Sequence, residues 1–568
     1  MKKKLLFIIS LFLTLIYFAY EVHCHLQFRT SFLLFDSYDF WEIFLHSIIP
    51  LLIYLIYLVK SNKLFEKYPP TTPILLFLLV LISSSFFSTI GVDPHHDGIM
   101  LKPALDVSRG LVLFKNTFTE YGGLSTYIQA LALKIFGEYL LTLKILTAIF
   151  YALISVLLYY ISIKFLPKFL AFISIILYFA IAPYYSFTFL IWSSVYALFF
   201  QLWGTLVLIN AISKKSSTKF LYVGILTALA FWCRQTVGVT MFFAVIGYFM
   251  YLIVFKKNKF KKIQLYLFKY ILGTLTICFL FLIYLFSTSS FTDWWKQTII
   301  YNYEWGKTYT GNYNVFRLIF FLFDTVDPKG LINFWTLIPV TTLLFFIKNW
   351  RHKNLTALTL IGLASWTQYF PLNDSVHLFW AAMPMLPLFA LFIFQLFKDF
   401  LLNKNQFTKH LSKYATALLM VIIFIPNLNY SLKAARQKIT NHYVYLQQPT
   451  ILRGLRIGDS DAQFYTNLYQ KIEKYFSNNP NGNVIDNGPD PLYLTFDPRI
   501  KNIYPMFFNW FSIKQSVYPN YDQQVNQYIK NNQPLIVSEI QDIPQNYCQI
   551  KYLNPTNYKT AILSQYCQ

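Results

Sequence analysis

Long apolar segments separated by short basic loops constrain this chain more than any other feature. A membrane-spanning helix needs roughly 20 largely apolar residues, and the sequence contains about thirteen segments of this kind. They are residues 5–20, 43–59, 73–90, 141–163, 170–187, 189–210, 220–233, 237–255, 270–286, 331–346, 355–370, 378–396 and 415–426. Only 13% of the 568 residues are charged, against about a quarter in soluble domains. The sequence therefore predicts a mainly α-helical, multi-pass membrane protein.

The positions of Lys and Arg predict which loops face the cytoplasm. If Lys2–Lys4 are cytoplasmic, every second loop carries a basic cluster, as the positive-inside rule requires. These clusters occupy residues 60–67, 164–168, 214–219, 256–262, 348–353 and 398–413. The N-terminus is then cytoplasmic and the C-terminus extracytoplasmic, and we expect a bacterial plasma membrane. The residues that give the net charge of +23 lie mostly in these loops. Nucleic acid is not an expected partner, because no basic stripe with interleaved aromatic residues lies outside them.

The first span could instead be a cleaved signal peptide, because MKKK precedes the apolar run 5–20. No small-residue cleavage site follows that run. An uncleaved first span is therefore expected.

Three long segments are predicted to face outward. In residues 91–138, two short amphipathic helices at 98–110 and 124–137 are expected to lie on the membrane interface, or alternatively to be buried packing helices. Residues 287–330 are rich in Trp and Tyr, which anchor interfaces and also stack on sugars. The third segment is the C-terminal tail.

The tail alternates predicted helices and strands. Helical spacing at 461–476 and 522–532 alternates with short apolar runs at 482–488 and 534–540 that are bounded by turn residues. This pattern predicts a small extracytoplasmic α/β domain. We therefore expect a transmembrane domain over 1–430, with the outward loop 91–138, and an accessory domain over 431–568. Cys548 and Cys567 can form a disulfide bond there, or remain as two thiols.

The motif DPHHDG, residues 93–98, carries the most distinctive chemistry. Asp93 and Asp97 can supply a general base, or share a divalent cation for which His95 and His96 would be ligands. Alternatively, Asp93 caps the following helix and the histidines are interfacial. The predicted spans contain almost no ionisable side chains, which ion-coupled transport needs near mid-membrane. The pattern favours a reaction at the membrane surface.

Four short motifs lie at outward ends of predicted spans or in the outward loop: DPHHDG at 93–98, LKPALDVSRG at 101–110, FTEYGGL at 118–124 and NDSVH at 373–377. Together with the order of spans, outward loop and soluble tail, they resemble the GT-C superfamily of membrane glycosyltransferases. Protein O-mannosyltransferases, the aminoarabinose transferase of lipid A and oligosaccharyltransferase subunits belong to it. Gly123 departs from the family pattern, which usually has Pro there.

The resemblance implies a sugar donor carried on a polyprenyl phosphate and an extracytoplasmic lipid, glycan or protein acceptor. Asp93 would deprotonate the acceptor hydroxyl or hold a metal ion, with Asp97 as second carboxylate, and a single displacement would invert the anomeric centre. The positions implied for substrate binding are Lys102, Arg109, Glu120, Tyr121, Arg234, Asp374 and His377. Alternatively, Arg109 pairs with Asp106, and Arg234 reaches to the interface.

Three other functions fit parts of the pattern. A glycan ligase or polymerase that uses a lipid-linked oligosaccharide would share the outward loop. A lipid or glycan transporter would share the spans. A structural scaffold would not need the acidic motif.

Overall fold

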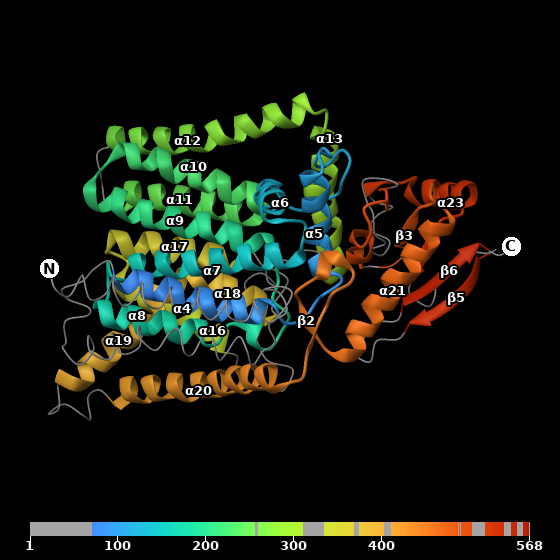
Figure 1. Ribbon diagram of the computed structural model, residues 1–568. Coiled ribbons are helices and arrows are strands. Elements are labelled where there is room, and N and C mark those ends of the chain that lie inside the picture. Colours follow the sequence, from blue (N-terminus) through green and yellow to red (C-terminus); the bar gives the residue numbers. More distant parts are fainter. Residues whose placement is uncertain are drawn as a thin grey trace, which may run out of the picture.

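The computed structural model describes residues 71–255, 260–310, 334–367, 374–402, 411–486, 488, 490–502, 517–538, 547–553 and 561–566 (Figure 1). The two predicted spans at 5–20 and 43–59 lie outside these residues. Each of the other eleven predicted spans falls on one or more helices.

Most of the helices run side by side in one bundle (Figure 1). Its members are α4 (Thr71–Ser88), α7 (Leu140–Ser162), α8 (Lys168–Phe179), α9 (Ser193–Lys214), α10 (Ser217–Cys233), α11 (Gln235–Val254), α12 (Phe260–Ser287), α16 (Phe334–Asn349), α17 (Lys353–Thr367), α18 (Ser375–Ala382), α19 (Leu386–Leu402) and α20 (Leu411–Thr440). The protein is an integral membrane protein with a mainly helical structure.

The predicted number of spans is not confirmed. Among the described residues, six helical segments are long and apolar enough to cross a membrane: Thr71–Ser88, Leu140–Ser162, Ser193–Lys214, Gln235–Val254, Phe260–Ser287 and Ser375–Leu396. Other predicted spans form shorter helices. For example, α8 ends at Phe179, ahead of Pro183, because the residue before a proline disfavours helical backbone.

Two glycines allow a close contact between helices α10 and α12. A Cβ on Gly224 of α10 would lie 2.0 Å from the carbonyl oxygen of Tyr270 of α12, and one on Gly273 would lie 2.1 Å from that of Leu221. The two backbones therefore touch, as small residues allow in membrane helices. The opposite side of α12 faces away from the bundle, since only 17% of the apolar stretch of this helix is buried.

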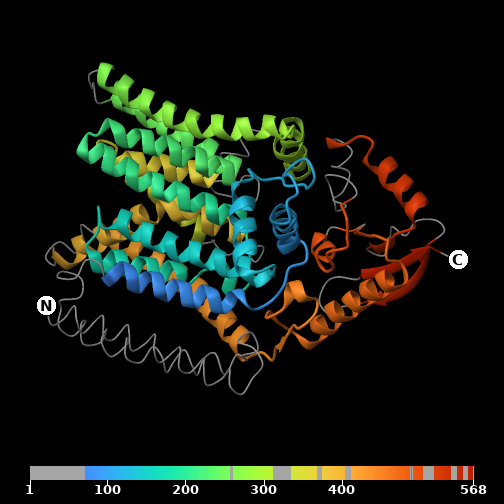
Figure 2. The ribbon, with the colours of Figure 1, turned by 45° about the horizontal axis from the view of Figure 1, so that its top comes forward.

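Two short helices of the outward loop, α5 (His96–Ser108) and α6 (Leu124–Phe136), lie across one end of the bundle (Figure 2). On α6, Leu131, Ile135 and Phe136 are large exposed apolar residues, which fits the predicted place on the membrane interface. The same prediction is wrong for α5. Every residue from Asp97 to Asp106 is buried, because the bundle and the C-terminal segment cover both sides of this helix.

The C-terminal segment, residues 441–566, contains the helices and strands that the sequence predicts. They are α21 (Asp459–Asn478), β3 (Val484–Asp486), α23 (Tyr521–Asn532) and β4 (Leu535–Ser538). Two further strands, β5 (Tyr547–Leu553) and β6 (Ala561–Tyr566), complete a sheet of order β3-β4-β6-β5. β3 pairs parallel with β4 and the other pairs are antiparallel. A separate pair joins β1 (Val444–Tyr445) to β2 (Arg456–Ile457).

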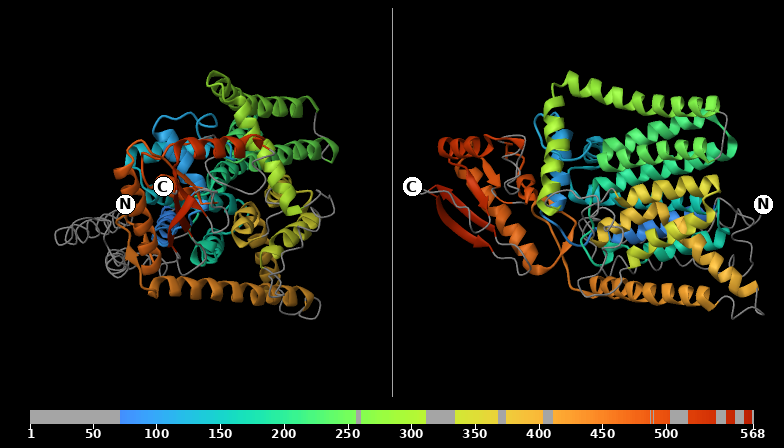
Figure 3. Two further views of the ribbon diagram at one scale, coloured as in Figure 1. Left: turned by 90° about the vertical axis from the view of Figure 1, so that its right-hand side faces the viewer. Right: turned by 180° about the vertical axis from the view of Figure 1, so that it is seen from behind.

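The C-terminal segment packs directly on the end of the bundle that carries α5 and α6 (Figure 3). The backbone NH of Gly91 donates to the carbonyl of Arg456 over 2.9 Å, and that of Arg456 donates to Thr89 over 2.8 Å. The guanidinium of Arg456 also donates to the Thr89 hydroxyl and lies over the ring of Phe86. The outward loop and the C-terminal segment therefore form one continuous structure.

Candidate active site

The acidic motif forms the turn between α4 and α5. Gly91 has a positive φ of +86° in this turn, and the Asp93 side chain then binds the backbone that leads into α5. Its Oδ1 accepts from the backbone NH groups of His95 (3.1 Å) and His96 (3.0 Å). Oδ2 lies 2.8 Å from Nδ1 of His96. Asp93 therefore holds the turn that leads into α5, whose N-cap residue is His95. In addition, 27% of the Asp93 side chain is exposed, so solvent can reach this carboxylate.

Asp97 has a different role, because it is completely buried. Its Oδ2 accepts from the backbone NH of Asp93 (3.0 Å) and lies 3.1 Å from Nζ of Lys144. Burial raises the pKa of Asp97, and the charge of Lys144 opposes this rise. Lys144 also donates to the carbonyl of Phe189 over 2.9 Å. Asp97 therefore holds the backbone of Asp93 in place and does not face an open surface.

Aromatic and cationic side chains from three other segments adjoin the motif. The ring of His96 meets Trp192 edge to face, with 5.1 Å between centroids, and Tyr121 meets the same indole at 5.4 Å. The guanidinium of Arg234 lies 5.3 Å from the centroid of the Tyr121 ring. Arg234 is the residue between α10 and α11, where the chain is extended. The bend between two membrane helices thus brings a cation to the motif.

Glu120 and His377 belong to the same electrostatic neighbourhood. Burial raises the pKa of Glu120, while a hydrogen bond with Tyr121 and the charges of Arg234 and His96 oppose the rise. Arg234 and His96 also interact electrostatically with His377 of α18. We define the active-site cluster as Asp93, His96, Glu120, Tyr121, Trp192, Arg234, Asp374 and His377.

Asp374 joins the active-site cluster through His377. It begins α18 and accepts from the backbone NH groups of Val376 and His377, and its Oδ2 contacts Nδ1 of His377. The cluster therefore gathers six predicted site residues that are far apart in the sequence, together with His96, which the sequence suggests as a metal ligand.

Lys102 and Arg109, which the resemblance assigns to phosphate binding, are engaged elsewhere. Lys102 is buried, with Nζ 2.5 Å from Oδ1 of Asp106. Arg109 pairs with Glu138, with 2.7 Å between Nη2 and Oε2. The alternative pairing of Arg109 with Asp106 is therefore wrong. Asp106 is occupied by Lys102, by the Thr117 hydroxyl and by the Asn502 amide, all within 3.0 Å.

A metal site at His95 and His96 gains no support from the donor set. Within the described parts of the chain, no three His, Cys, Asp or Glu side chains are grouped as metal ligands. The Nδ1 atom of His96 is hydrogen-bonded to Asp93, and the two imidazole rings meet edge to face at 4.9 Å. A metal ion at His95 and His96 therefore stays a prediction, and the proposed reaction has no step that depends on one.

A continuous helical segment after α12 supports the cluster. It consists of α13 (Phe291–Trp295), the π-helical turn Lys296–Ile300 and α14 (Tyr301–Thr310). Gln297 in the π turn is buried and binds the backbone of Phe114 and Thr119. Asn302 donates to the carbonyl of Glu120 over 2.8 Å. π turns occur frequently at functional sites, and this one fixes the loop that carries Glu120 and Tyr121.

A cavity of about 250 Å³ opens beside Asp93, between the bundle and the C-terminal segment. It is lined by Ile90, Gly91, Val92, Ser186, Phe187, Thr188, Lys438, Tyr443, Ile457, Gly458, Asp461 and Tyr465. Lys438 donates to the carbonyls of Tyr184 and Phe187, and burial lowers its pKa to about 8. Burial also raises the pKa of Tyr465. The negative charges of four nearby carboxylates raise it further, namely Asp461, Asp490, Asp93 and Asp97.

Sequence reasoning did not assign roles to Trp192, Lys438 or Tyr465. Their only signal is position: Trp192 lies near the outward end of a predicted span, and Lys438 follows the last one. Such a signal does not distinguish a site residue from an interfacial anchor.

Comparison with known proteins relates this geometry to membrane enzymes. Residues 124–284 match the family model of dolichyl-phosphate-mannose-protein mannosyltransferase. ArnT from Cupriavidus metallidurans, solved with bound undecaprenyl phosphate, has a similar fold, with a TM-score of 0.53 and 10% sequence identity over 86% of this chain and 97% of ArnT. The apo oligosaccharyltransferase of Archaeoglobus fulgidus gives a TM-score of 0.49 and 13% identity over 84% and 70% of the two chains. No curated protein sequence matches the chain.

The family-model match covers α6 to α12, the part of the chain that includes Trp192 and Arg234. The likeness to ArnT extends over nearly all of that enzyme and is a likeness of fold. Together they confirm that this chain resembles the GT-C superfamily of membrane glycosyltransferases.

Proposed function

We propose that the protein is a membrane glycosyltransferase that transfers a sugar from a polyprenyl-phosphate donor to an extracytoplasmic acceptor. The observation that carries the proposal is the partly exposed carboxylate of Asp93, which contacts through His96, Trp192 and Tyr121 connect to Arg234 at the end of a membrane bundle. One side chain there can accept a proton and another can neutralise a phosphate. The bound undecaprenyl phosphate of the ArnT structure supports a lipid-phosphate donor.

In the proposed reaction, Asp93 acts as general base. Its Oδ2 takes the proton of the acceptor hydroxyl as the acceptor oxygen attacks the anomeric carbon of the donor sugar. The bond from that carbon to the phosphate oxygen breaks, and its electron pair leaves with the polyprenyl phosphate. A single displacement inverts the anomeric centre. Asp97 and Lys144 act as positioning residues, because they fix the backbone NH of Asp93.

Arg234 is the proposed partner of the donor phosphate. Phosphate is a leaving group that needs cationic stabilisation as charge develops on it. Arg234 also stands at the N-terminus of α11, where helix dipoles favour anions. Glu120, Tyr121, Asp374 and His377 are proposed to line the sugar and acceptor sites, and the cavity beside Lys438 and Tyr465 is the proposed acceptor entrance.

The proposed orientation follows the basic loops. The end with α5, α6 and the C-terminal segment is extracytoplasmic, the N-terminus is cytoplasmic, and residues 431–568 form the accessory domain. A cysteine introduced at Asp461 should react with an impermeant reagent added outside cells, and one at Lys262 should not. The reverse pattern would contradict this topology.

The test of function uses purified protein in liposomes with a polyprenyl-phosphate sugar and an acceptor extract. D93N should abolish sugar transfer while folding is retained. D459N is the matched control, since Asp459 is 61% exposed and lies at the start of α21. R234K should raise the KM for donor more than it lowers kcat. Full transfer activity of D93N would show that Asp93 is not the general base. Movement of donor across liposomes without a transfer product would favour the transporter.

The same assay separates the proposal from a glycan ligase or polymerase. The mass of the product shows whether one sugar or a preassembled oligosaccharide has been transferred.

A further inference from the structure

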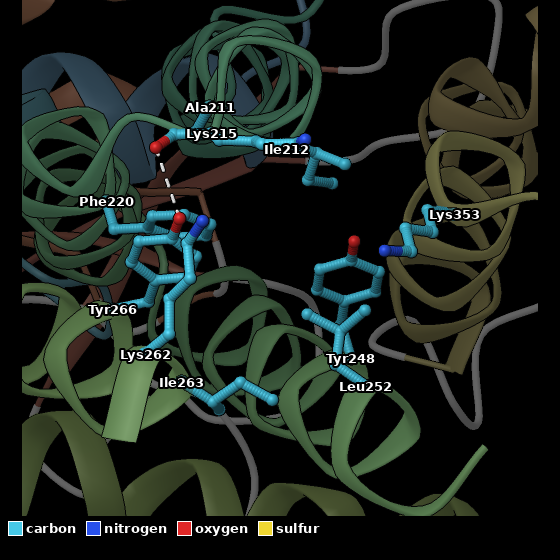
Figure 4. Close-up of a pocket in the computed structure, with 10 residues that line it drawn as sticks. All are labelled: Ala211, Ile212, Lys215, Phe220, Tyr248, Leu252, Lys262, Ile263, Tyr266 and Lys353. Atoms are coloured by element: carbon cyan, nitrogen blue, oxygen red, sulfur yellow. Dashed lines mark hydrogen bonds between the residues drawn. The ribbon is translucent and has the colours of Figure 1, made fainter. Parts of the chain in front are cut away.

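A second cavity, of about 160 Å³, lies at the end of the bundle opposite to the active-site cluster. It is formed where five membrane helices end or begin, namely α9, α10, α11, α12 and α17. The residues that line it are Ala211, Ile212, Lys215, Phe220, Tyr248, Leu252, Lys262, Ile263, Tyr266 and Lys353 (Figure 4). We call this cavity the basic pocket.

Three lysines from three separate helix ends surround the basic pocket. Lys215 ends α9, Lys262 lies in the first turn of α12, and Lys353 begins α17. The Lys215 backbone is held by the hydroxyl of Tyr266, which donates to its carbonyl over 3.1 Å. Figure 4 shows the three amino groups around the same open space. The three lysines are exposed, so solvent screens their mutual repulsion in part, and an anion between them would relieve it further.

The two sequence stretches that line the basic pocket contain no carboxylate. The sequence has no Asp or Glu between Glu138 and Asp293, and none between Asp327 and Asp374. Every residue that lines the basic pocket falls in one of these two stretches. The positive-inside rule accounts for lysines in cytoplasmic loops. It does not account for their convergence on a cavity.

A buried hydroxyl adds a second, independent sign of a ligand. Tyr248 of α11 is only 1% exposed, and its hydroxyl has no hydrogen-bond partner among the residues that the structure describes. Figure 4 shows that hydroxyl directed into the basic pocket. A buried polar group without a partner is costly. A phosphate oxygen in the pocket would accept its hydrogen bond.

The surroundings of the basic pocket suit a lipid. Large apolar side chains next to it on α11 and α12 are exposed, including Met250 (60%), Val254 (61%) and Phe268 (59%). These surfaces can contact acyl chains while the lysines hold a headgroup at the membrane boundary. Basic pockets between membrane helices bind anionic lipid headgroups in this way.

We propose that the basic pocket binds the phosphate of an anionic phospholipid through Lys215, Lys262, Lys353 and the Tyr248 hydroxyl. This site is separate from the proposed donor site, which lies at the other end of the bundle. Its ligand is a membrane lipid that is not consumed.

The test measures lipid binding and stability of the full chain in nanodiscs of phosphatidylcholine, with and without phosphatidylglycerol. Phosphatidylglycerol should raise the Tm of the wild type. K215Q, K262Q and K353Q should each weaken phosphatidylglycerol binding about fivefold, as expected for roughly 1 kcal/mol per lysine. In phosphatidylcholine alone the same variants should have an unchanged or higher Tm, because they relieve repulsion. A lysine variant that loses phosphatidylglycerol binding but keeps or gains Tm in phosphatidylcholine has lost a binding site. A variant whose lysine has only a structural role would lose Tm in both lipids.

K164Q is the matched control, since Lys164 is exposed after α7 and does not line the basic pocket. It should retain the full response to phosphatidylglycerol. Y248F tests the hydroxyl and should raise the Tm in phosphatidylcholine while it reduces the response to phosphatidylglycerol. Equal responses in the wild type and the three lysine variants would overturn the proposal. A rise in Tm with inorganic phosphate, but not with phosphatidylglycerol, would overturn the lipid assignment.

Discussion

Lys144 of α7 and Asp97 of α5 form an ion pair with 3.1 Å between Nζ and Oδ2, and neither side chain has any exposed surface. This pair joins a membrane helix to the helix that follows the acidic motif. Through the backbone NH of Asp93 it also reaches the exposed carboxylate. The position of the proposed general base therefore depends on a buried interaction with a membrane helix.

Removal of one partner of this pair should be strongly destabilising. K144M leaves the Asp97 carboxylate buried without its cation, and we expect the free energy of unfolding to fall by about 3–5 kcal/mol. D97N should also reduce transfer activity, because Asp93 loses its anchor. Thermal unfolding in detergent and transfer assays on the folded fraction measure the two effects.

The double variant D97N/K144M provides the control for this prediction. Its loss of stability should be smaller than the sum of the two single losses, since no buried charge remains unpaired. K134M, at an exposed position on α6, should change little. Additive losses in the double variant would show that the two residues do not interact.

Gly98 sets the contact between α5 and the C-terminal segment. A Cβ at this position would lie 2.3 Å from the backbone nitrogen of Leu492, and that nitrogen donates to Pro94. Because backbone atoms cannot move aside as a flexible side chain can, G98A should separate the two surfaces and lower the Tm. Limited proteolysis should cut the C-terminal segment of G98A faster than that of the wild type.

G247A is the matched control for G98A. Gly247 also lies within a helix, and a Cβ there would meet nothing within 4 Å. An equal loss of stability in both variants would mean that the α5 contact is not the cause.

Glu120 should make stability depend on pH. Burial raises its pKa above the ordinary value of 4.5, so the folded state binds this proton more tightly than the unfolded state. The stability from this group is therefore fully present below pH 4.5 and is lost as pH rises through the raised pKa. E120Q resembles the protonated form. Its Tm relative to the wild type should rise with pH above 4.5.

The stability of D374N relative to the wild type should depend on pH in the opposite way. Burial favours protonation of Asp374, but the bonds with His377 outweigh it and lower the pKa below 3.8. The stability from this carboxylate is present above pH 3.8 and is lost as pH falls through the lowered pKa. D374N should therefore be less stable than the wild type above pH 3.8, with the difference shrinking as pH falls. Parallel pH profiles for both variants would contradict the two assignments.

The C-terminal segment should contain a disulfide between Cys548 and Cys567. Cys548 is disulfide-bonded, whereas Cys567 lies outside the described residues. Such a bond closes a loop over residues 549–566 and is worth about 3 kcal/mol. Peptide mapping without reductant should recover the two cysteines in one linked fragment, and C567S should lower the Tm as much as reduction does. A free thiol at Cys567 would exclude this pairing.

The sequence by itself determined the helical membrane architecture and the elements of the tail. Apolar segments must be buried in lipid or protein, and in lipid only a helix satisfies its own backbone hydrogen bonds. The eleven predicted spans among the described residues are therefore helical, although several are too short or too broken to count as spans. The helices α21 and α23 also follow from local spacing, since one apolar stripe at helical period must face a core.

Only the tertiary structure decided which polar residues meet. Asp93, Glu120 and Arg234 lie in separate loops and His377 lies in the first turn of α18, and no local pattern predicts that these segments meet. Likewise, the choice of Glu138 as partner for Arg109, and of Lys144 for Asp97, depends on how α5 packs. Burial depends on the packing of the whole protein. The spacing of α5 fits an interfacial helix, and the C-terminal segment that covers it begins more than 330 residues later in the sequence.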